Sequence, residues 1–381
     1  MSKLNDLIKE LCPNGVEYVK LEELVDYIQP AKYIVKNTNY DIKYDVPVLT
    51  AGQTFILGYT NEKDGIYYAS ADNPVVIFDD FTTSNHWVDF NFKVKSSAMK
   101  ILISKTDNLF KYIYYCISNI DYVPKEHSRQ WIQVYSQFQI PLPPLKVQEE
   151  IVRILDKFGE LEAELEAELE TRKNQYEFWR GKLLNQKNEV KKLSEVSDVI
   201  DSLHATPQYV ENGYPMIRVA DVKGGIVNTT GALRVDVETY NKFVSKYKPQ
   251  KGDIIISRVG SFGNLCIVGD EDMCLGQNTS IIHPRINDKY LYYYLSSDIV
   301  QDWIKNNVNG SGYKSLSLAN INEIPIAVPS IQEQQKVANI LDQFDKLIND
   351  ISEGLPAEIE LRRQQYEYYR NKLLSFKEIQ N

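Results

Sequence analysis

Two segments of the chain place several hydrogen-bonding side chains at matching points of the sequence: KEHSRQW (125–131) and NGSGYKS (309–315). Each segment lies shortly before a proline-containing run, IPLPP (140–144) or IPIAVPS (324–330). Ammonium, guanidinium, imidazole, hydroxyl and amide groups are suited to contacts with phosphate oxygens and with the edges of bases. The candidates for such contacts in the two segments are Lys125, His127, Arg129, Gln130, Ser311, Tyr313 and Lys314.

Other polar candidates lie in loops after strand-like apolar runs such as VVIFDD (75–80) and GDIIIS (252–257). One of these loops is flanked by glycines, so its backbone could approach a ligand closely, and another carries amides that could pair with adenine. These candidates are Thr82, Thr83, Asn85, Arg258, Ser261, Gln277 and Asn278. The alternative for every candidate is a turn residue whose side chain satisfies its own backbone. The sequence leaves that alternative open.

Motifs for catalysis by the chain itself are missing from the sequence. DNPVV (72–76) is the nearest match to an adenine methyltransferase loop, but it lacks the second proline and the aromatic residue. The phosphate-binding pattern G-x-x-x-x-G-K-[ST] does not occur. DVK (221–223) has the acid–x–Lys form of a metal nuclease, yet three residues match by chance in most proteins. We therefore expect no catalytic residues, and the scattered histidines and cysteines predict no metal site.

Composition bounds the class of protein. The chain is 43% hydrophobic and 25% charged, as is typical of soluble globular proteins, and 381 residues suit two or three domains. The net charge of −9 speaks against a generally basic nucleic-acid binder. Within residues 140–189, however, the acids are concentrated in ELEAELEAELE (160–170), which leaves room for positive surface elsewhere. No secretory signal or membrane span is visible, so a cytoplasmic location is expected.

An internal repeat organises the chain. ILDKF (154–158) returns as ILDQF (340–344), and RKNQYEFWRGKLL (172–184) returns as RRQQYEYYRNKLL (362–374), with four more residues between the motifs. Four residues are close to one helical turn, so the helix faces stay in phase. Apolar spacings of three, four and seven predict two long helices, over 146–187 and 331–376, which would pair antiparallel as a coiled coil. Pro356 should kink or interrupt the second helix.

A weaker similarity extends the repeat backwards. KLEELVDYI (20–28) matches KLSEVSDVI (192–200), and KYIYYCIS (111–118) matches KYLYYYLSS (289–297). The sequence therefore predicts an α+β protein, with two mixed α/β units separated by two long antiparallel coiled-coil helices and related by a pseudo-twofold repeat. The expected divisions are 1–143 for the first unit, 144–189 for the first helix, 190–328 for the second unit and 329–381 for the second helix.

The order of these motifs resembles a known family. IPLPPLKVQEEIVRILDKF (140–158), its second copy, and GDIIISRVGSFGN (252–264) are together similar to the specificity subunit of a type I restriction–modification system. The resemblance covers essentially the whole chain. It implies that the two units are target recognition domains, each reading one half of a split, asymmetric site in double-stranded DNA. Glycine and proline at 354 and 356 depart from a continuous second helix.

The resemblance also implies partners. The helices would dock two modification (methyltransferase) subunits, and restriction (motor nuclease) subunits would join them. S-adenosylmethionine would be bound by the methyltransferase subunit, and this chain would carry no cofactor of its own. The alternative is a non-catalytic scaffold that binds protein or RNA, although two diverged reading units argue against it. A steep salt dependence of binding to duplex DNA would separate the two possibilities, since phosphate contacts produce it.

Overall fold

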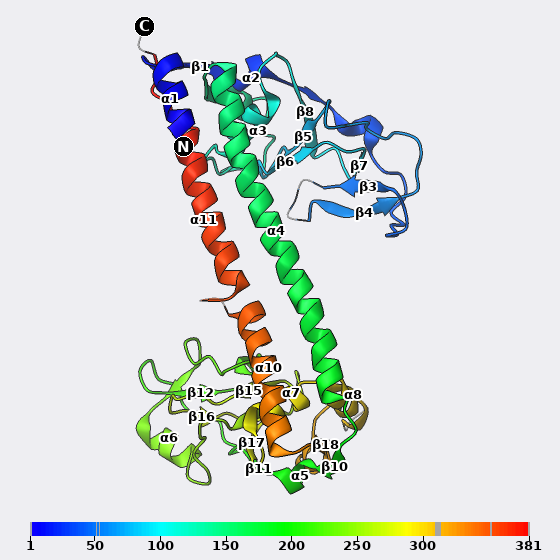
Figure 1. Ribbon diagram of the computed structural model, residues 1–381, viewed down its shortest axis with the longest axis vertical. Helices are drawn as coiled ribbons and strands as arrows, with labels where there is room; N and C mark the ends of the chain where they lie inside the picture. The colour runs from blue at the N-terminus through cyan, green and yellow to red at the C-terminus, as the bar shows by residue number, and fades with distance from the viewer. Residues whose placement is uncertain (1, 51, 53, 309–313, 351–352, 380–381) are drawn as a thin grey trace. The chain divides into compact units, whose positions relative to one another are not determined.

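The computed structural model describes the chain except for residues 1, 51, 53, 309–313, 351–352 and 380–381. The fold divides into two compact units (Figure 1). Unit 1 comprises Met1–Leu165 together with Ile359–Asn381, and unit 2 comprises Glu166–Glu358. The end of the chain therefore folds with its beginning. Among the described helices, none is both long and apolar enough to cross a membrane.

Unit 1 is built on a four-stranded antiparallel sheet with the strand order β2-β8-β5-β6. The central strand β5 is buried over Val75–Phe78, so both of its faces are covered. A smaller three-stranded sheet has the order β4-β3-β7. The strands of these two sheets are β2 (Val25–Ile28), β3 (Val46–Leu49), β4 (Ile56–Thr60), β5 (Val75–Asp79), β6 (Asn85–Val88), β7 (Lys93–Val94) and β8 (Met99–Ser104).

Unit 2 repeats this topology. Its four-stranded sheet has the order β11-β17-β14-β15, and its three-stranded sheet the order β13-β12-β16. The register is also repeated, because Asp79 lies opposite Met99 in unit 1 and Ser257 lies opposite Thr279 in unit 2. The strands are β11 (Ser197–Asp201), β12 (Tyr214–Ile217), β13 (Arg234–Val235), β14 (Ile254–Ser257), β15 (Leu265–Ile267), β16 (Cys274–Leu275) and β17 (Thr279–Pro284). The predicted α+β fold with an internal repeat is confirmed.

Short helices complete the two units. In unit 1 they are α1 (Ser2–Leu11), α2 (Leu21–Leu24) and α3 (Phe110–Ser118), with 3-10 turns at Pro30–Tyr33 and Tyr135–Gln137. In unit 2 they are α5 (Leu193–Val196), α6 (Val237–Phe243), α7 (Asp288–Leu295), α8 (Asp298–Asn307) and α9 (Leu318–Asn322), with a 3-10 turn at Val219–Asp221. The matching tyrosine-rich segments 111–118 and 289–297 form most of α3 and α7.

A two-stranded ribbon closes each strand-rich unit. Strand β1 (Glu17–Lys20) pairs with β9 (Gln139–Leu142) in unit 1, and β10 (Glu189–Lys192) pairs with β18 (Pro325–Val328) in unit 2. In both cases the second strand of the ribbon leads directly into a long helix. The first and last strands of each unit thus lie side by side where that helix begins.

The long helices differ in continuity. Helix α4 (Leu145–Leu184) is a single helix of 40 residues, whereas the second copy is divided into α10 (Ile331–Asn349) and α11 (Leu355–Leu373). The second copy is interrupted between Asn349 and Leu355, shortly before Pro356, in agreement with the predicted interruption. Pro356 lies in the first turn of α11, where a backbone N–H would have no partner within the helix and its absence costs little.

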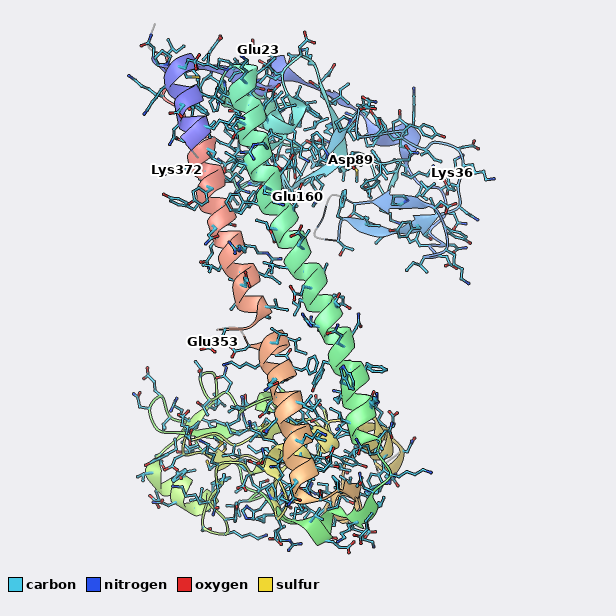
Figure 2. All side chains as sticks on the ribbon, viewed as in Figure 1. Glu23, Lys36, Asp89, Glu160, Glu353 and Lys372 are labelled. Atoms are coloured by element: carbon cyan, nitrogen blue, oxygen red, sulfur yellow. The ribbon has the colours of Figure 1, made fainter. Side chains whose placement is uncertain are left out.

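Each unit pairs a part of α4 with a part of the second copy. In unit 1, Phe158 of α4 stacks on Tyr369 of α11 at 5.4 Å between ring centroids, and Arg363 forms an ion pair with Glu162 at 2.6 Å. Because residue numbers rise on one helix as they fall on the other, this pair is antiparallel. In unit 2, the rings of Tyr176 of α4 and Phe344 of α10 lie side by side, with their centroids 6.3 Å apart. Figure 2 labels Glu160 and Lys372, two exposed charged residues of the unit 1 pair.

A buried glutamine fixes the start of each long helix. The Gln148 side chain donates to the carbonyl oxygen of Pro143 at 2.7 Å and accepts from the N–H of Leu109 at 3.1 Å, just before α3. Gln334 does the same in unit 2, donating to Pro329 at 2.8 Å and accepting from Asn287 at 3.0 Å. The repeated glutamine therefore ties the long helix to the segment that begins α3 or α7.

The aspartate of the repeated ILD motif completes this joint. The hydroxyl of Tyr115 on α3 donates to the Asp156 carboxylate, and that of Tyr293 on α7 donates to Asp342 at 2.7 Å. Burial and these hydrogen bonds raise the pKa of both tyrosines far above the ordinary value. Both hydroxyls consequently remain protonated donors at neutral pH.

We expect Gln148→Ala to lower the free energy of unfolding by about 1–3 kcal/mol, because it leaves a buried N–H and a buried C=O without their partner. Urea unfolding followed by circular dichroism would measure the change. Glu149→Ala, at the exposed neighbouring position, is the matched control and should have little effect. Equal unfolding midpoints for the two variants would contradict the assigned role of Gln148.

The Glu150 side chain generates a pH prediction. It is 3% exposed, and hydrogen bonds from Arg153 (2.7 Å) and Lys3 (2.8 Å) lower its pKa to about 2. Since the folded pKa lies below the unfolded value of about 4.3, this interaction stabilises the fold above pH 5 and is lost as the pH falls towards 2. The stability difference between the wild type and Glu150→Gln should therefore shrink between pH 6 and pH 3. A pH-independent difference in urea midpoints would show that Glu150 acts otherwise.

Candidate nucleic-acid interface

The turn between β5 and β6 provides the first part of the site in unit 1. The Asp79 carboxylate accepts hydrogen bonds from the N–H groups of Phe81 (2.8 Å) and Thr82 (3.0 Å). Thr83 has a left-handed φ of 64° and is buried. Asn85 donates to the carbonyl oxygen of Thr83 at 3.3 Å and accepts from a serine hydroxyl of α3 at 2.5 Å. Of the three candidates in this turn, only Thr82 is exposed.

The segment 125–131 lies against this turn. His127 stacks on Phe81 with ring centroids 4.6 Å apart, and the N–H of Gln130 donates to the carbonyl oxygen of Asp80 at 2.8 Å. The structure therefore brings together two candidate loops that are more than 40 residues apart in the sequence. Lys125, His127 and Arg129 are exposed at this place.

Gln130 differs from its neighbours in this segment. Its side chain is buried, accepts from the Tyr122 hydroxyl at 2.8 Å and donates to the carbonyl oxygen of Ser128 at 2.8 Å. Both ends of the amide are thus engaged within the protein. Gln130 shapes the loop in this structure, which is the alternative that the sequence had left open for each candidate.

A buried ion pair that sequence reasoning missed underlies the two loops. The Asp80 carboxylate and the Lys100 ammonium lie 3.4 Å apart and are 1% and 0% exposed. The other carboxylate oxygen of Asp80 accepts from the N–H of Trp131 at 2.9 Å. The only signal in the sequence was the doubled aspartate at the end of an apolar run, and nothing marked Lys100 as its partner.

The corresponding loops also meet in unit 2. The backbone N–H of Arg258 donates to the carbonyl oxygen of Asn278 at 2.8 Å. The N–H of Leu316 in turn donates to the carbonyl oxygen of Arg258 at 2.8 Å. Asn278 has a left-handed φ of 64°. Ser261 and Gln277 are exposed beside these contacts, and the Gln277 amide donates to a threonine hydroxyl at 3.3 Å.

Lys314 is exposed close to the Arg258–Leu316 contact, two residues before Leu316. Ser311 and Tyr313, the other candidates of this segment, lie outside the described residues. Their proposed contacts remain predictions.

The guanidinium of Arg258 is held from two sides. Its Nε donates to the carbonyl oxygen of Leu316 at 3.1 Å, and Nη1 forms a short contact with the Asp201 carboxylate. His204 and Ser280 also bond to Asp201, at 3.0 and 3.1 Å. Although burial works in the opposite direction, these hydrogen bonds lower the pKa of Asp201, so it is ionised at neutral pH. Sequence reasoning had identified Arg258 but not Asp201.

Nothing in the described part of the chain groups three or more histidine, cysteine or acidic residues as a metal site. The four cysteines are buried and unpaired, and burial raises the pKa of three thiols, those of Cys116, Cys266 and Cys274, to about 12. Thiols of this kind are mostly protonated and therefore poor nucleophiles at neutral pH. The polar groups that remain exposed near the two loop clusters are suited to hydrogen bonding and to phosphate contacts.

Comparisons with known proteins agree with this architecture. The family described as the type I restriction modification DNA specificity domain matches residues 13–171 and 185–361. Over 403 residues the chain is 42% identical to the specificity subunit of the type I restriction enzyme EcoR124I/EcoR124II of Escherichia coli, covering 99% of this chain and 98% of the relative. A putative type I restriction enzyme specificity subunit of Haemophilus influenzae is 29% identical over 398 residues, covering 97% and 98%.

Solved structures share the fold at lower sequence identity. The S subunit of a type I restriction–modification system from M. genitalium aligns with a TM-score of 0.57 and 16% identity over 95% of this chain and 97% of its own. A chain from a study of complex assembly and conformational transition of the type I system aligns with a TM-score of 0.59 and 15% identity over 96% and 98%. The family match and the E. coli relative confirm the resemblance: the chain belongs to the family of type I restriction–modification specificity subunits.

Proposed function

We propose that this chain is the non-catalytic subunit that reads a bipartite, asymmetric sequence in double-stranded DNA, with one half-site for each unit. The observation that carries the proposal is the double occurrence of one loop arrangement. In unit 1 the N–H of Gln130 donates to the carbonyl oxygen of Asp80, and in unit 2 the N–H of Leu316 donates to that of Arg258. The backbone arrangement is the same, while the side chains that it presents differ.

Different side chains on one backbone frame favour two different half-sites. Unit 1 presents Lys125, His127 and Arg129 as exposed donors, and unit 2 presents Gln277 and Lys314. Lysine and arginine provide phosphate contacts and can read guanine, whereas an amide suits adenine. A single DNA sequence would not satisfy both sets, so the target should be asymmetric.

We assign to the long helices the role of setting the distance between the two half-sites. Helix α4 is continuous over 40 residues, about 60 Å at about 1.5 Å per residue. It begins in unit 1 and ends in unit 2. A helix holds its length, whereas a flexible linker would let the gap between half-sites vary. The proposal is therefore a reader with a fixed gap, comparable in principle to dimeric readers of two half-sites.

The helices also carry matched exposed aromatic residues. Phe178 on α4 is 64% exposed, and Tyr368, at the equivalent place of the repeat on α11, is 60% exposed. Large aromatic side chains of this kind are enriched at protein interfaces. Their duplication supports two docking sites for two methyltransferase subunits. Those subunits would bind S-adenosylmethionine, and restriction subunits would add to the complex.

The test is a map of adenine methylation across the host genome, with and without this chain. Deletion should abolish methylation at one split, asymmetric motif. Replacing residues 1–139 with those of a relative should change one half of the motif and leave the other half and the gap unchanged, which assigns each half-site to a unit. If neither deletion nor replacement altered the methylation map, the proposed function would be wrong.

Arg129→Ala should relax recognition in the unit 1 half-site and leave the unit 2 half-site unchanged. Loss of one good base contact costs about 1–3 kcal/mol of discrimination, or about 5- to 150-fold in methylation rate between the correct base and a wrong one. The measurement is methylation of DNA duplexes with single changes in either half-site. Glu126→Ala is the matched control, because Glu126 is exposed in the same segment and is not a candidate DNA contact. A uniform loss with Arg129→Ala would make this residue a phosphate anchor instead.

Phe178→Ser and Tyr368→Ser should each remove one methyltransferase subunit from the complex, and the double variant should remove both, because each residue belongs to its own docking site. Native mass spectrometry of the reconstituted complex would count the subunits. Tyr68→Ser is the control, since Tyr68 is 67% exposed but lies outside the long helices. Retention of two subunits by the double variant would exclude these aromatic residues as docking contacts.

A further inference from the structure

The Asp80–Lys100 pair in unit 1 is costly as a purely structural feature. Both side chains are fully buried, and the desolvation of two charges can exceed their mutual attraction. Neither the Oδ2 atom of Asp80 nor the ammonium of Lys100 has a hydrogen-bond partner among the described residues. An apolar pair would suit a core position at least as well. The charge therefore calls for a role beyond stability.

Unit 2 has a partly buried charge of the opposite sign at the same position. The registers align Asp79 with Ser257, so the next residue, Asp80, corresponds to Arg258. Arg258 pairs with Asp201, and both side chains are 17% exposed. In both units, the residue that follows β5 or β14 is thus charged and forms an ion pair with a residue of the opposite charge.

Both charges hold the loop that presents the candidate DNA contacts. Asp80 accepts from the N–H of Trp131 at 2.9 Å, and its second oxygen lies 3.9 Å from the guanidinium of Arg129. Arg258 makes the converse bond, because its guanidinium donates to the carbonyl oxygen of Leu316 at 3.1 Å. A carboxylate binds an N–H in one unit, and a guanidinium binds a C=O in the other.

We propose that Asp80 and Arg258 are positioning residues, each of which fixes one reading loop (residues 125–131 in unit 1, residues 314–316 in unit 2) and thereby sets the specificity for one half-site. This inference rests on the proposed function. Recognition of a base edge requires donors placed to within a fraction of an ångström, and side chains on loops reach that precision only when buried groups support them. The sign of the charge determines which backbone group of the loop is held: an N–H in unit 1 and a C=O in unit 2. In unit 1 the negative charge also attracts Arg129.

The test uses the chain assembled with its methyltransferase subunits and DNA duplexes that carry single changes in either half-site. Asp80→Ala/Lys100→Met removes both charges together, so that no unpaired charge is left buried. We expect discrimination in the unit 1 half-site to fall about tenfold, as for the loss of one base contact, and discrimination in the unit 2 half-site to stay unchanged. Arg258→Met/Asp201→Asn should give the converse result.

Two further variants separate positioning from folding. Asp80→Asn/Lys100→Met keeps an oxygen for the Trp131 N–H but lacks the charge that attracts Arg129, so it should restore only part of the discrimination. If the alanine variant does not fold, this remaining loss relative to the wild type is the test. Lys93→Met/Glu62→Gln removes another ion pair of unit 1, with Lys93 1% exposed and 3.0 Å from Glu62, at a strand of the smaller sheet. This control should alter thermal stability without relaxing either half-site.

The inference would be overturned if folded Asp80 variants discriminated between correct and changed bases in the unit 1 half-site as strictly as the wild type. It would also be overturned if the Lys93→Met/Glu62→Gln control relaxed that half-site equally. Either result would leave the proposed function itself untouched. If the wild-type complex methylated the duplexes without regard to half-site sequence, the proposed function itself would be wrong. The wild-type assay is therefore read first, and the variants are compared with it.

Discussion

The hydrogen-bonded joint between a tyrosine-rich helix and a long helix is the interaction on which each unit depends. A buried glutamine at the start of the long helix, Gln148 or Gln334, bonds to the backbone just before that helix. It also bonds to the backbone just before the tyrosine-rich helix α3 or α7. A tyrosine, Tyr115 or Tyr293, then donates to the aspartate of the ILD motif two turns further along. Buried polar groups of this kind are costly unless every partner is present, so the joint permits one arrangement of helix and strands.

This constraint accounts for the uneven similarity between the two halves of the chain. The residues of the joint and of the helix stripes recur closely, as in ILDKF (154–158) and ILDQF (340–344), because each must meet a specific partner. The strands need only supply apolar side chains that fill a core, which many sequences can do. The loops at the sheet ends carry different side chains in the two units. The scaffold can therefore be repeated while the surface that it presents diverges.

The two loop clusters show how far such divergence can go on one backbone. In both units a backbone N–H of the second loop bonds to the carbonyl oxygen of the residue that follows the central strand. That residue is an acid in unit 1 and a base in unit 2, and its ion-pair partner changes accordingly from the buried Lys100 to the partly buried Asp201. The fold tolerates the exchange because a pair of opposite charges can be reversed without leaving either one alone.

The sequence by itself determined the α+β class, the internal repeat, the long helices and the break at Pro356, because these follow from local patterns: helical periodicity, repeated motifs and a residue without an N–H. It also identified the segment 125–131, where Lys125, His127 and Arg129 are indeed exposed. Only the tertiary structure decided that Gln130 and Thr83 turn inward, that Asp80 meets Lys100, and that the end of the chain folds with unit 1. These features depend on contacts between residues far apart in the sequence. Residue types predict which groups can bond, but the fold decides which groups meet.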